Sequence, residues 1–587
     1  MIPRYIFIYL FFSKVMSSPY PSLQTRDLPS PSIWDIQVPS KLRVALETHF
    51  SPLQTTYPGM LKFSKTKKQT PFLRFDHKFH LEEFVGDIPY RSGSFSGKVR
   101  EYVNGNSTDN ITDISGFCKI THLLDAYRMI QGTYPVAQHP ALPSPGRKSA
   151  KVYSKLHDPH NQAYVDAVAC YMLSKFRESD HSPHFSLFYG GYLAIAKQYY
   201  YNITEDFPEL RFESWFWRRR AQGHFKLLGF DGDEPLENDH PLMEGPDDAL
   251  DGSTTSSDSS STVSELLGYS DNKDDVGSLH SATIDTVSES SDGDSDDSDE
   301  SDESDEIGND VKLFAAISEF PTMLMFIESN TDTMDSLFED YEEVGVPLGT
   351  PEWENRWSAW LFQIVAALCQ IQSLWAMTHN DLHSNNILWT PTDKEFIFYR
   401  SDDGRIWRVP TYGKLFRIID FGRAIFTHNG TLFISDDYWP DNEAGSQYNF
   451  GPLYDPKSER IYPNPSFDLS RLSVSIIEAL FKYIPDDKED GHILSEEMDR
   501  TQNETVSELY NVLWSWLIDE DGCNILWDEH QNEKYPGFDL YNVIAKKVKG
   551  AVPREQLDKA PFSGFALSSA DASLAASSGV KIYSLFC

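Results

Sequence analysis

The sequence predicts a mixed α+β protein that is interrupted by a long disordered acidic segment. Apolar runs with strand character occur at 151–156, 185–200 and 323–330. Segments with apolar residues at helical spacing occur at 161–176, 352–377 and 467–477. Because 587 residues are too many for one compact core, we expect a two-lobed domain with extensions, or two to four domains.

The formal net charge of −38 is concentrated in one segment of the chain. Residues 231–310 contain 27 Asp and Glu residues against one Lys, a net charge of −26, which leaves −12 for the rest. Such a segment buries too little apolar surface to offset the entropy of ordering, so we expect a disordered, solvated insert. A basic partner could bind it. Non-specific nucleic-acid binding is not expected, because it needs clustered Lys and Arg.

The two ends of the chain are expected to be flexible. Residues 1–70 form a predicted flexible arm, since 16–70 are rich in Pro and Ser, and the Ala/Ser-rich residues 559–587 form a predicted disordered tail. Folded regions are then expected at 71–340, interrupted by the acidic insert, and at 341–558.

The apolar run Tyr5–Phe12 resembles a signal-peptide core, but it is too short to span a bilayer and no clear cleavage site follows. The five cysteines are scattered and form no C-x-x-C pair, which fits a reducing compartment. We therefore expect an intracellular protein, cytoplasmic or nuclear, without membrane association.

Two polar motifs carry most of the functional signal. Residues 378–388 read T-H-N-D-L-H-S-N-N-I-L, and residues 417–422 read R-I-I-D-F-G, with the aspartate at the end of an apolar strand. Asp381 in the first motif can accept the proton of an attacking hydroxyl group. Asn386, five residues later, and Asp420 offer the hard oxygen ligands that Mg²⁺ prefers.

In this order, the two motifs resemble the catalytic loop and the metal-binding loop of the eukaryotic-type protein-kinase superfamily. Divergent kinase-like proteins of large DNA viruses and protists show similar stretches, and D-L-H also occurs in haspin-like kinases. The resemblance implies a bilobal fold with a β-rich N-lobe and a helical C-lobe. It also implies that ATP and Mg²⁺ are used to phosphorylate Ser or Thr of a protein substrate, with Asp381 as base and Asn386 and Asp420 as metal ligands.

The same resemblance suggests the lysine that contacts the nucleotide phosphates. Val152–Lys155 has the form of V-A-I-K, and Asp166 on the following helix is the candidate acidic partner of Lys155. Lys151 lies on the same face of the predicted strand and is an alternative, and both lysines could instead be solvated surface residues. Gly93–Val99 weakly resembles a phosphate-covering loop, but a plain turn is the preferred interpretation.

The adenine site and a helix anchor complete the predicted site. The apolar strand that ends at Glu328 resembles an inter-lobe hinge, so backbone groups from Glu328 to Asn330 would hydrogen-bond adenine, and Leu388 would lie beneath it. Asp468, at the start of a helix, would anchor the catalytic-loop backbone or act only as an N-terminal helix acid. Apolar runs between Asn386 and Asp420, separated by D-D-G, predict an inserted β-hairpin.

Several features depart from the kinase pattern. Asn380 replaces the usual arginine before the catalytic aspartate, so we expect no strict need for phosphorylation of the activation segment. His383 stands where many protein kinases have lysine, and it could contact the transferring phosphoryl group and titrate near neutrality, or only pack. The segment 423–465 lacks A-P-E. A small-molecule kinase on the same fold and a catalytically inactive pseudokinase scaffold are therefore the alternatives.

Overall fold

The structure is a computed structural model of the 587-residue chain. It describes residues 32–63, 73–134, 141–143, 152–231, 234–236, 240–243, 311–440, 442, 444–497, 500–528, 530 and 532–586. The apolar run Tyr5–Phe12, Lys151 and most of the acidic insert, including 244–310, lie outside the described residues. Within the described part, no helix combines the length and the apolar character needed to cross a bilayer.

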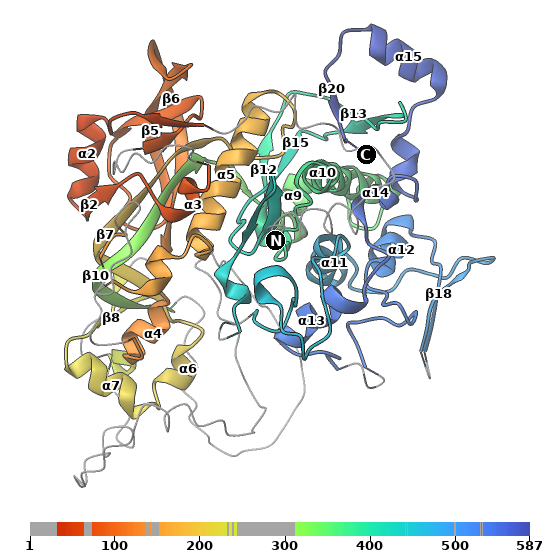
Figure 1. Ribbon diagram of the computed structural model, residues 1–587. Coiled ribbons are helices and arrows are strands. Elements are labelled where there is room, and N and C mark those ends of the chain that lie inside the picture. The colour runs from red at the N-terminus through yellow and green to blue at the C-terminus, as the bar shows by residue number, and fades with distance from the viewer. Residues whose placement is uncertain are drawn as a thin grey trace.

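The fold is a mixed α+β structure (Figure 1). The strands are β1 (Ile33–Asp35), β2 (Phe50–Gln54), β3 (Leu73–Phe75), β4 (Phe79–Val85), β5 (Gly93–Val103), β6 (Asn106–His122), β7 (Phe188–Asn202), β8 (Lys226–Asp231), β9 (Glu234–Pro235), β10 (Val311–Glu328), β11 (Asp332–Thr333), β12 (Ile387–Pro391), β13 (Phe396–Arg400), β14 (Ile406–Pro410), β15 (Lys414–Ile418), β16 (Ile425–His428), β17 (Thr431–Ile434), β18 (Ile493–Glu497), β19 (Arg500–Asn503) and β20 (Ile582–Ser584). The α-helices are α2 (Ser40–Glu47), α3 (Pro58–Leu61), α4 (Ala126–Gln131), α5 (Gln162–Glu178), α6 (Phe207–Leu210), α7 (Ser214–Ala221), α9 (Tyr341–Val344), α10 (Pro351–Trp375), α11 (Phe467–Leu480), α12 (Glu508–Ser515), α13 (Phe538–Lys547), α14 (Pro553–Gln556) and α15 (Ser569–Ser577).

The first half of the chain builds one large antiparallel sheet with the strand order β2-β7-β10-β6-β5-β4. The central strand β10 pairs with β7 on one side and with β6 on the other, and β8 extends the sheet beside the start of β10. Helix α5 packs against β7 and β10 (Figure 1). Asn161 caps this helix, because its side chain accepts a hydrogen bond from the Ala163 N–H group. The sheet thus presents β6, α5 and β10 together to the other half of the molecule.

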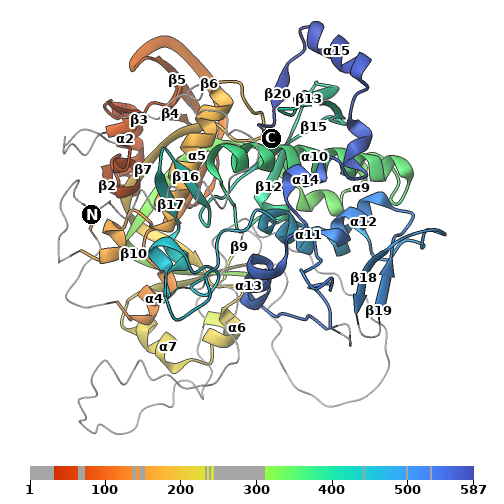
Figure 2. The ribbon, with the colours of Figure 1, turned by 45° about the vertical axis from the view of Figure 1, so that its right-hand side comes forward.

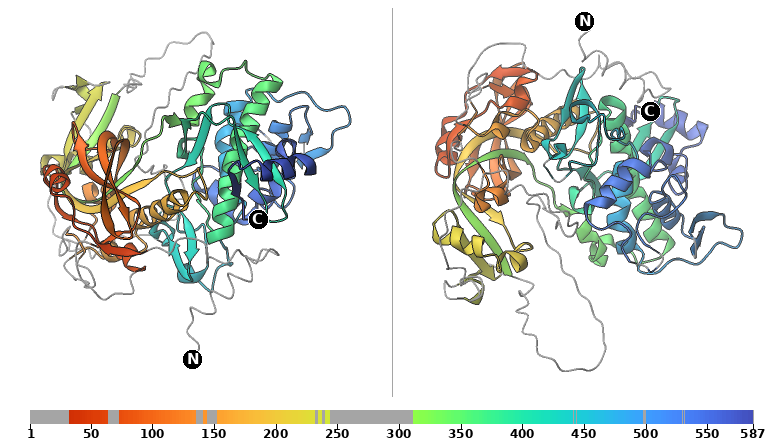
Figure 3. Two further views of the ribbon diagram at one scale, coloured as in Figure 1. Left: turned by 90° about the horizontal axis from the view of Figure 1, so that it is seen from above. Right: turned by 60° about the horizontal axis from the view of Figure 1, so that its bottom comes forward.

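The second half is mainly helical and is organised around α10. Thr350 caps α10 by accepting a hydrogen bond from Trp353 N, Pro351 occupies the first turn, and Ala376 ends the helix in the left-handed conformation. This helix agrees with the prediction at 352–377, and every side chain from Trp357 to Ile371 is buried. The two halves lie side by side (Figure 3), and the two predicted motifs lie between α10 and the large sheet.

Two segments that were expected to be flexible are folded. In the first, residues 32–63 form β1, α2, β2 and α3, and Leu42 and Leu46 are fully buried. In the second, the predicted disordered tail forms α15 and then β20, which pairs in parallel with β13 (Figure 2). The expectation of disorder was wrong because it rested on the Ala/Ser-rich composition of the whole tail, which contains one short strand. Tyr583 and Leu585 are buried, and β20 pairs with β13 at the edge of the predicted β13–β14 hairpin.

Two local predictions are corrected by the same structure. The segment predicted as a strand at 151–156 is instead a 3-10 turn over Ser154–His157, because Leu156 enters the core while Lys155 turns towards Asp436. Gly93–Val99 is not a plain turn. It belongs to the long strand β5, which pairs with β6 and buries Phe95 and Val99.

Candidate functional site

A cleft of about 540 Å³ lies between the sheet and the helical half. Strands β6 and β10, helix α5 and the two motif segments supply its walls. Among the lining residues are Lys119, Asp166, Glu328, Asn330, Leu388 and Asp420. The cleft therefore gathers five of the predicted site residues together with Lys119, which the sequence interpretation had not selected. Four predicted site residues are not among those that line it: Lys155, Asp381, His383 and Asn386.

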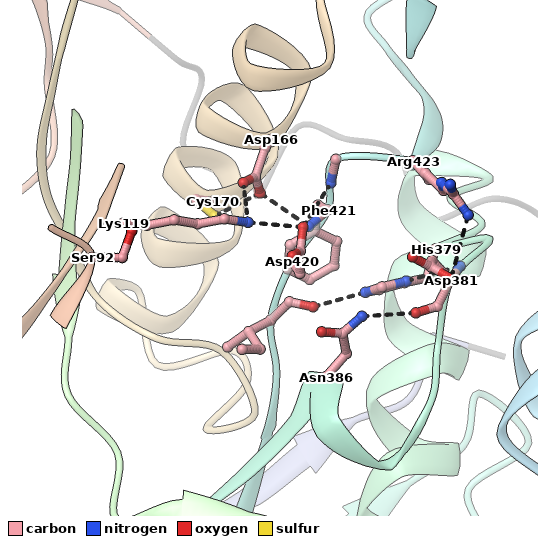
Figure 4. Close-up of polar contacts among 12 residues, drawn as sticks. Ser92, Lys119, Asp166, Cys170, His379, Asp381, Asn386, Asp420, Phe421 and Arg423 are labelled. Atoms are coloured by element: carbon pink, nitrogen blue, oxygen red, sulfur yellow. Dashed lines mark hydrogen bonds and ion pairs between the residues drawn. The ribbon is translucent and has the colours of Figure 1, made fainter. Parts of the chain in front are cut away.

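Lys119 on β6 forms an ion pair with two carboxylates at once (Figure 4). Its Nζ atom lies 2.8 Å from Asp166 Oδ2 and 2.8 Å from Asp420 Oδ1. The other oxygen of Asp166 accepts a hydrogen bond of 3.0 Å from Phe421 N. Burial alone would lower the pKa of Lys119, but the two carboxylates raise it, so the lysine is charged. Burial opposes ionisation of Asp420, whose pKa Lys119 nevertheless lowers.

The predicted phosphate lysine, Lys155, lies elsewhere. Its Nζ atom is 3.2 Å from Asp436 Oδ2, and Asp436 also accepts a hydrogen bond from Gln162 N at the start of α5. Lys155 thus ties the turn before α5 to the segment after β17. The sequence pointed to Lys155 because this residue precedes the helix that carries Asp166. In the structure β6 pairs with β10, which sets Lys119 opposite Met325, and Lys119 is the lysine that contacts Asp166. The available signal was a lysine inside the apolar run Phe117–Ile120.

The 378–388 motif is fixed to the 417–422 motif and to α11. His379 Nε2 donates to Ile419 O at 2.8 Å, its Nδ1 accepts from Asp381 N at 3.2 Å, and its ring lies 5.1 Å from that of Phe421. Asp468 on α11 accepts hydrogen bonds from the backbone N–H groups of His379 and Asn380 at 2.9–3.0 Å. These contacts confirm the predicted packing of His379 and the predicted backbone anchor.

Asn380 is fully buried and holds a left-handed backbone conformation, with φ of 65°. Its side-chain oxygen accepts a hydrogen bond of 2.6 Å from the Tyr448 hydroxyl group, and its amide donates to Arg423 O at 3.0 Å. Asn380 therefore connects the 378–388 motif directly to the 423–465 segment. Because both ends of this amide are engaged, the connection needs no phosphate group.

Asp381 carries a negative charge at neutral pH. Burial opposes ionisation, but the nearby charges of Arg423 and Arg471 and a hydrogen bond from Tyr541 hold the pKa of Asp381 at about 2. The Tyr541 hydroxyl group donates to Asp381 Oδ1 at 2.9 Å, and Arg423 Nη1 lies 3.7 Å from the same oxygen. The carboxylate is thus held in place and has the charge state of a proton acceptor.

Asn386 contacts both the backbone of Asp381 and the ring of His383. The amide nitrogen of Asn386 donates to Asp381 O at 2.9 Å and lies 3.0 Å from His383 Nε2. The Asn386 Oδ1 atom is buried and has no hydrogen-bond partner among the described residues. Burial lowers the pKa of His383 to about 4, so the expected titration of His383 near neutrality is wrong and the imidazole is neutral there.

The residues present fit a divalent cation only in part. Asp420, whose backbone φ is 61°, uses Oδ1 for Lys119, and its Oδ2 has no partner among the described residues. Asn386 Oδ1 is an unsatisfied buried acceptor, which costs free energy unless a ligand binds it. Within the described ranges, no group of three or more His, Cys, Asp or Glu side chains could hold a metal ion. A cation here would need further oxygens from a bound phosphate or from water, as Mg²⁺ commonly does.

The predicted hinge ends at a carboxylate that the protein itself neutralises. Burial opposes ionisation of Glu328, but Arg177 and Arg417 lower its pKa, and Arg417 Nη1 lies 3.1 Å from its carboxylate. The N–H groups of Glu328 and Ser329 donate to Leu187 O and Ser115 O. The Asn330 N–H group has no partner among the described residues, so it is available to a ligand in the cleft.

Neither a protein-family model nor a curated protein matches this chain. The chemistry of the site therefore rests on its own geometry. That geometry places a partly exposed, ionised carboxylate at Asp381, and the amide of Asn386, whose oxygen is unsatisfied, contacts the backbone of the same residue. On β6, Lys119 is held between the carboxylates of Asp166 and Asp420. Such an arrangement can bind an anionic group through the lysine and orient a hydroxyl group at Asp381.

Proposed function

We propose that the protein is an ATP-dependent phosphotransferase with a bilobal protein-kinase-like fold, acting as a serine/threonine protein kinase. The observation that carries this proposal is the double ion pair of Lys119 with Asp166 and Asp420. A kinase uses a strand lysine for the phosphates, an acidic partner on the adjacent helix and an aspartate that holds Mg²⁺. The strand, helix and loop that carry these three side chains occur here in the same chain order.

Each side chain has a definite task in this proposal. Lys119 contacts the α- and β-phosphates, and Asp166 orients it. Asp420 and Asn386 would hold Mg²⁺, which when bound neutralises charge on the phosphates. Asp381, ionised at neutral pH, orients the acceptor hydroxyl group and accepts its proton. A carboxylate with so low a pKa is a weak base, which suits a loose transition state. In such a transition state the acceptor hydroxyl group loses its proton late, so the main task of Asp381 is to position that hydroxyl group.

The neighbouring parts of the cleft suit the rest of a nucleotide. Leu388 lines the cleft and would lie against adenine, and the Asn330 N–H group would donate to the adenine ring. The turn between β4 and β5 contributes Tyr90, Arg91 and Ser92 to the same cleft. In the proposed fold this turn, and not Gly93–Val99, covers the phosphates.

The test is phosphoryl transfer by the purified protein in the presence of γ-labelled ATP, Mg²⁺ and a mixed protein extract. The proposal predicts protein labelling that is lost in Asp381→Asn, which keeps the size of the side chain, and retained in the matched surface variant Asp393→Asn. ATP turnover that appears only when a small metabolite is added would identify a small-molecule kinase. Absence of nucleotide binding would identify a non-catalytic scaffold and would refute the proposal.

A further inference from the structure

The side chain of Tyr541 reaches Asp381 from a distant part of the chain. Tyr541 lies on α13, 160 residues after Asp381, and its hydroxyl group is 2.9 Å from Asp381 Oδ1. No other side chain of α13 has a hydrogen bond to the catalytic-loop motif among the described contacts. The second carboxylate oxygen, Oδ2, has no hydrogen-bond partner within the described part of the chain.

The direction of this hydrogen bond follows from its other partner. Arg471 Nε donates to the same hydroxyl oxygen at 2.9 Å, and a guanidinium group can only donate. The single hydroxyl proton of Tyr541 must therefore point at the carboxylate. A hydrogen bond to an ionised acceptor is about twice as strong as a neutral one, so this contact restrains the carboxylate strongly.

The ring of Tyr541 is itself held on several sides. Its centroid lies 4.8 Å from the Phe538 ring, in a stacked arrangement, and the guanidinium groups of Arg471 and Arg423 lie 5.3 and 5.8 Å from it. Arg471 is one turn after Asp468 on α11, and Asp468 anchors the backbone of the same loop. Helix α11 thus holds the loop in two ways, directly through Asp468 and through Tyr541 by way of Arg471.

We propose that Tyr541 is a positioning residue for the base: it holds Asp381 Oδ1 and leaves Oδ2 directed to the acceptor hydroxyl group. This inference rests on the proposed phosphotransferase function and adds to it a residue whose hydroxyl group contacts the base but no other residue of the proposed site. The opposite role, in which the Tyr541 hydroxyl group occupies the place of the acceptor and blocks transfer, predicts the opposite kinetic result.

The experiment compares Tyr541→Phe with the wild-type full-length protein. Phenylalanine keeps the ring contacts and removes only the hydroxyl group. We expect kcat to fall by roughly ten-fold or more, as for loss of a hydrogen bond to a charged group, with KM for ATP unchanged. Tyr535→Phe, whose hydroxyl group contacts no site residue among the described contacts, is the matched control and should retain wild-type kcat. An unchanged or increased kcat in Tyr541→Phe would overturn the inference.

A second readout does not depend on activity. Burial raises the pKa of the Tyr541 phenol, Arg471 lowers it, and the Asp381 carboxylate raises it further. Removing that charge in Asp381→Asn should let the phenol ionise at lower pH, seen by ultraviolet difference titration against Asp381→Asn/Tyr541→Phe. His383 and Arg423 also face this carboxylate and are unchanged in both proteins. If the wild type transfers no phosphoryl group, the proposed function fails. The titration then decides alone whether Tyr541 holds Asp381. A Tyr541 pKa that is the same with and without the Asp381 carboxylate would refute the contact.

Discussion

Replacing Lys119 and Lys155 separately by methionine tests the proposal that Lys119, and not Lys155, binds the nucleotide. Both side chains are largely buried and both pair with a carboxylate, so either substitution leaves a buried charge without its partner. Breaking such a pair costs about 3 kcal/mol of the free energy of unfolding. Both variants should therefore be destabilised in urea unfolding, which makes them matched controls for each other.

Only Lys119→Met should change the chemistry of the cleft. Its ammonium group lies 2.8 Å from Asp420 and lines the cleft, whereas Lys155 lies 3.2 Å from Asp436 and does not. We expect roughly 10- to 100-fold weaker ATP binding in calorimetry for Lys119→Met, as for loss of a charge-assisted hydrogen bond. ATP affinity should be unchanged in Lys155→Met.

The stability of Lys119→Met should also depend on pH. In the wild type Lys119 lowers the pKa of Asp420, so the substitution lets that pKa rise. In the variant, protonation of Asp420 removes a buried charge that has lost its partner. The difference in the free energy of unfolding between wild type and Lys119→Met should therefore shrink as the pH falls. ATP binding that survives in Lys119→Met and is lost in Lys155→Met would refute this assignment of the two lysines.

Three further perturbations test the scaffold around the site. Asp468→Asn removes the charge that accepts two backbone N–H groups of the catalytic loop, so transfer rate should fall by roughly ten-fold while ATP affinity, measured by calorimetry, is retained. Burial lowers the pKa of His184 to about 4 from 6.5. Between these two pH values the unfolded protein binds a proton that the folded protein does not, so the free energy of unfolding should fall by roughly 3 kcal/mol as the pH drops through this range. Urea unfolding of His184→Gln should show a smaller loss over that range. Truncation after Gly579 removes β20 with buried Tyr583 and Leu585, which should lower the unfolding free energy by about 3 kcal/mol, whereas Leu574→Ala on the exposed face of α15 should not.

Much of the site could be predicted because its motifs are local. The spacing of Asp381 and Asn386 within one loop is a property of a few consecutive residues, and the helix that carries Asp166 has a clear apolar stripe. The contact of His379 with Phe421 follows from the same short segments. Asp166, the predicted acidic partner, does line the cleft, but it pairs with Lys119 and not with Lys155 as predicted.

The remaining features depend on contacts between distant segments. Lys119 comes beside Asp166 only because β6 pairs with β10 and α5 packs on that sheet, and no local pattern specifies such pairings. Tyr541 reaches Asp381 across 160 residues for the same reason. The tail was mistaken for disorder because its Ala/Ser-rich helix α15 is exposed, while the strand that follows it is only three residues long and depends on β13.

Calorimetric titration of ATP with and without Mg²⁺ is the most direct test of the claim that this cleft binds a magnesium nucleotide. The account predicts that the wild type binds ATP more tightly with Mg²⁺. In Asp420→Asn the Mg²⁺-dependent gain should fall by roughly 100-fold or be lost, as for removal of one electrostatic group, whereas Asp381→Asn should keep it. A wild-type protein that binds no ATP, or binds it equally well after Mg²⁺ is chelated, would contradict the account.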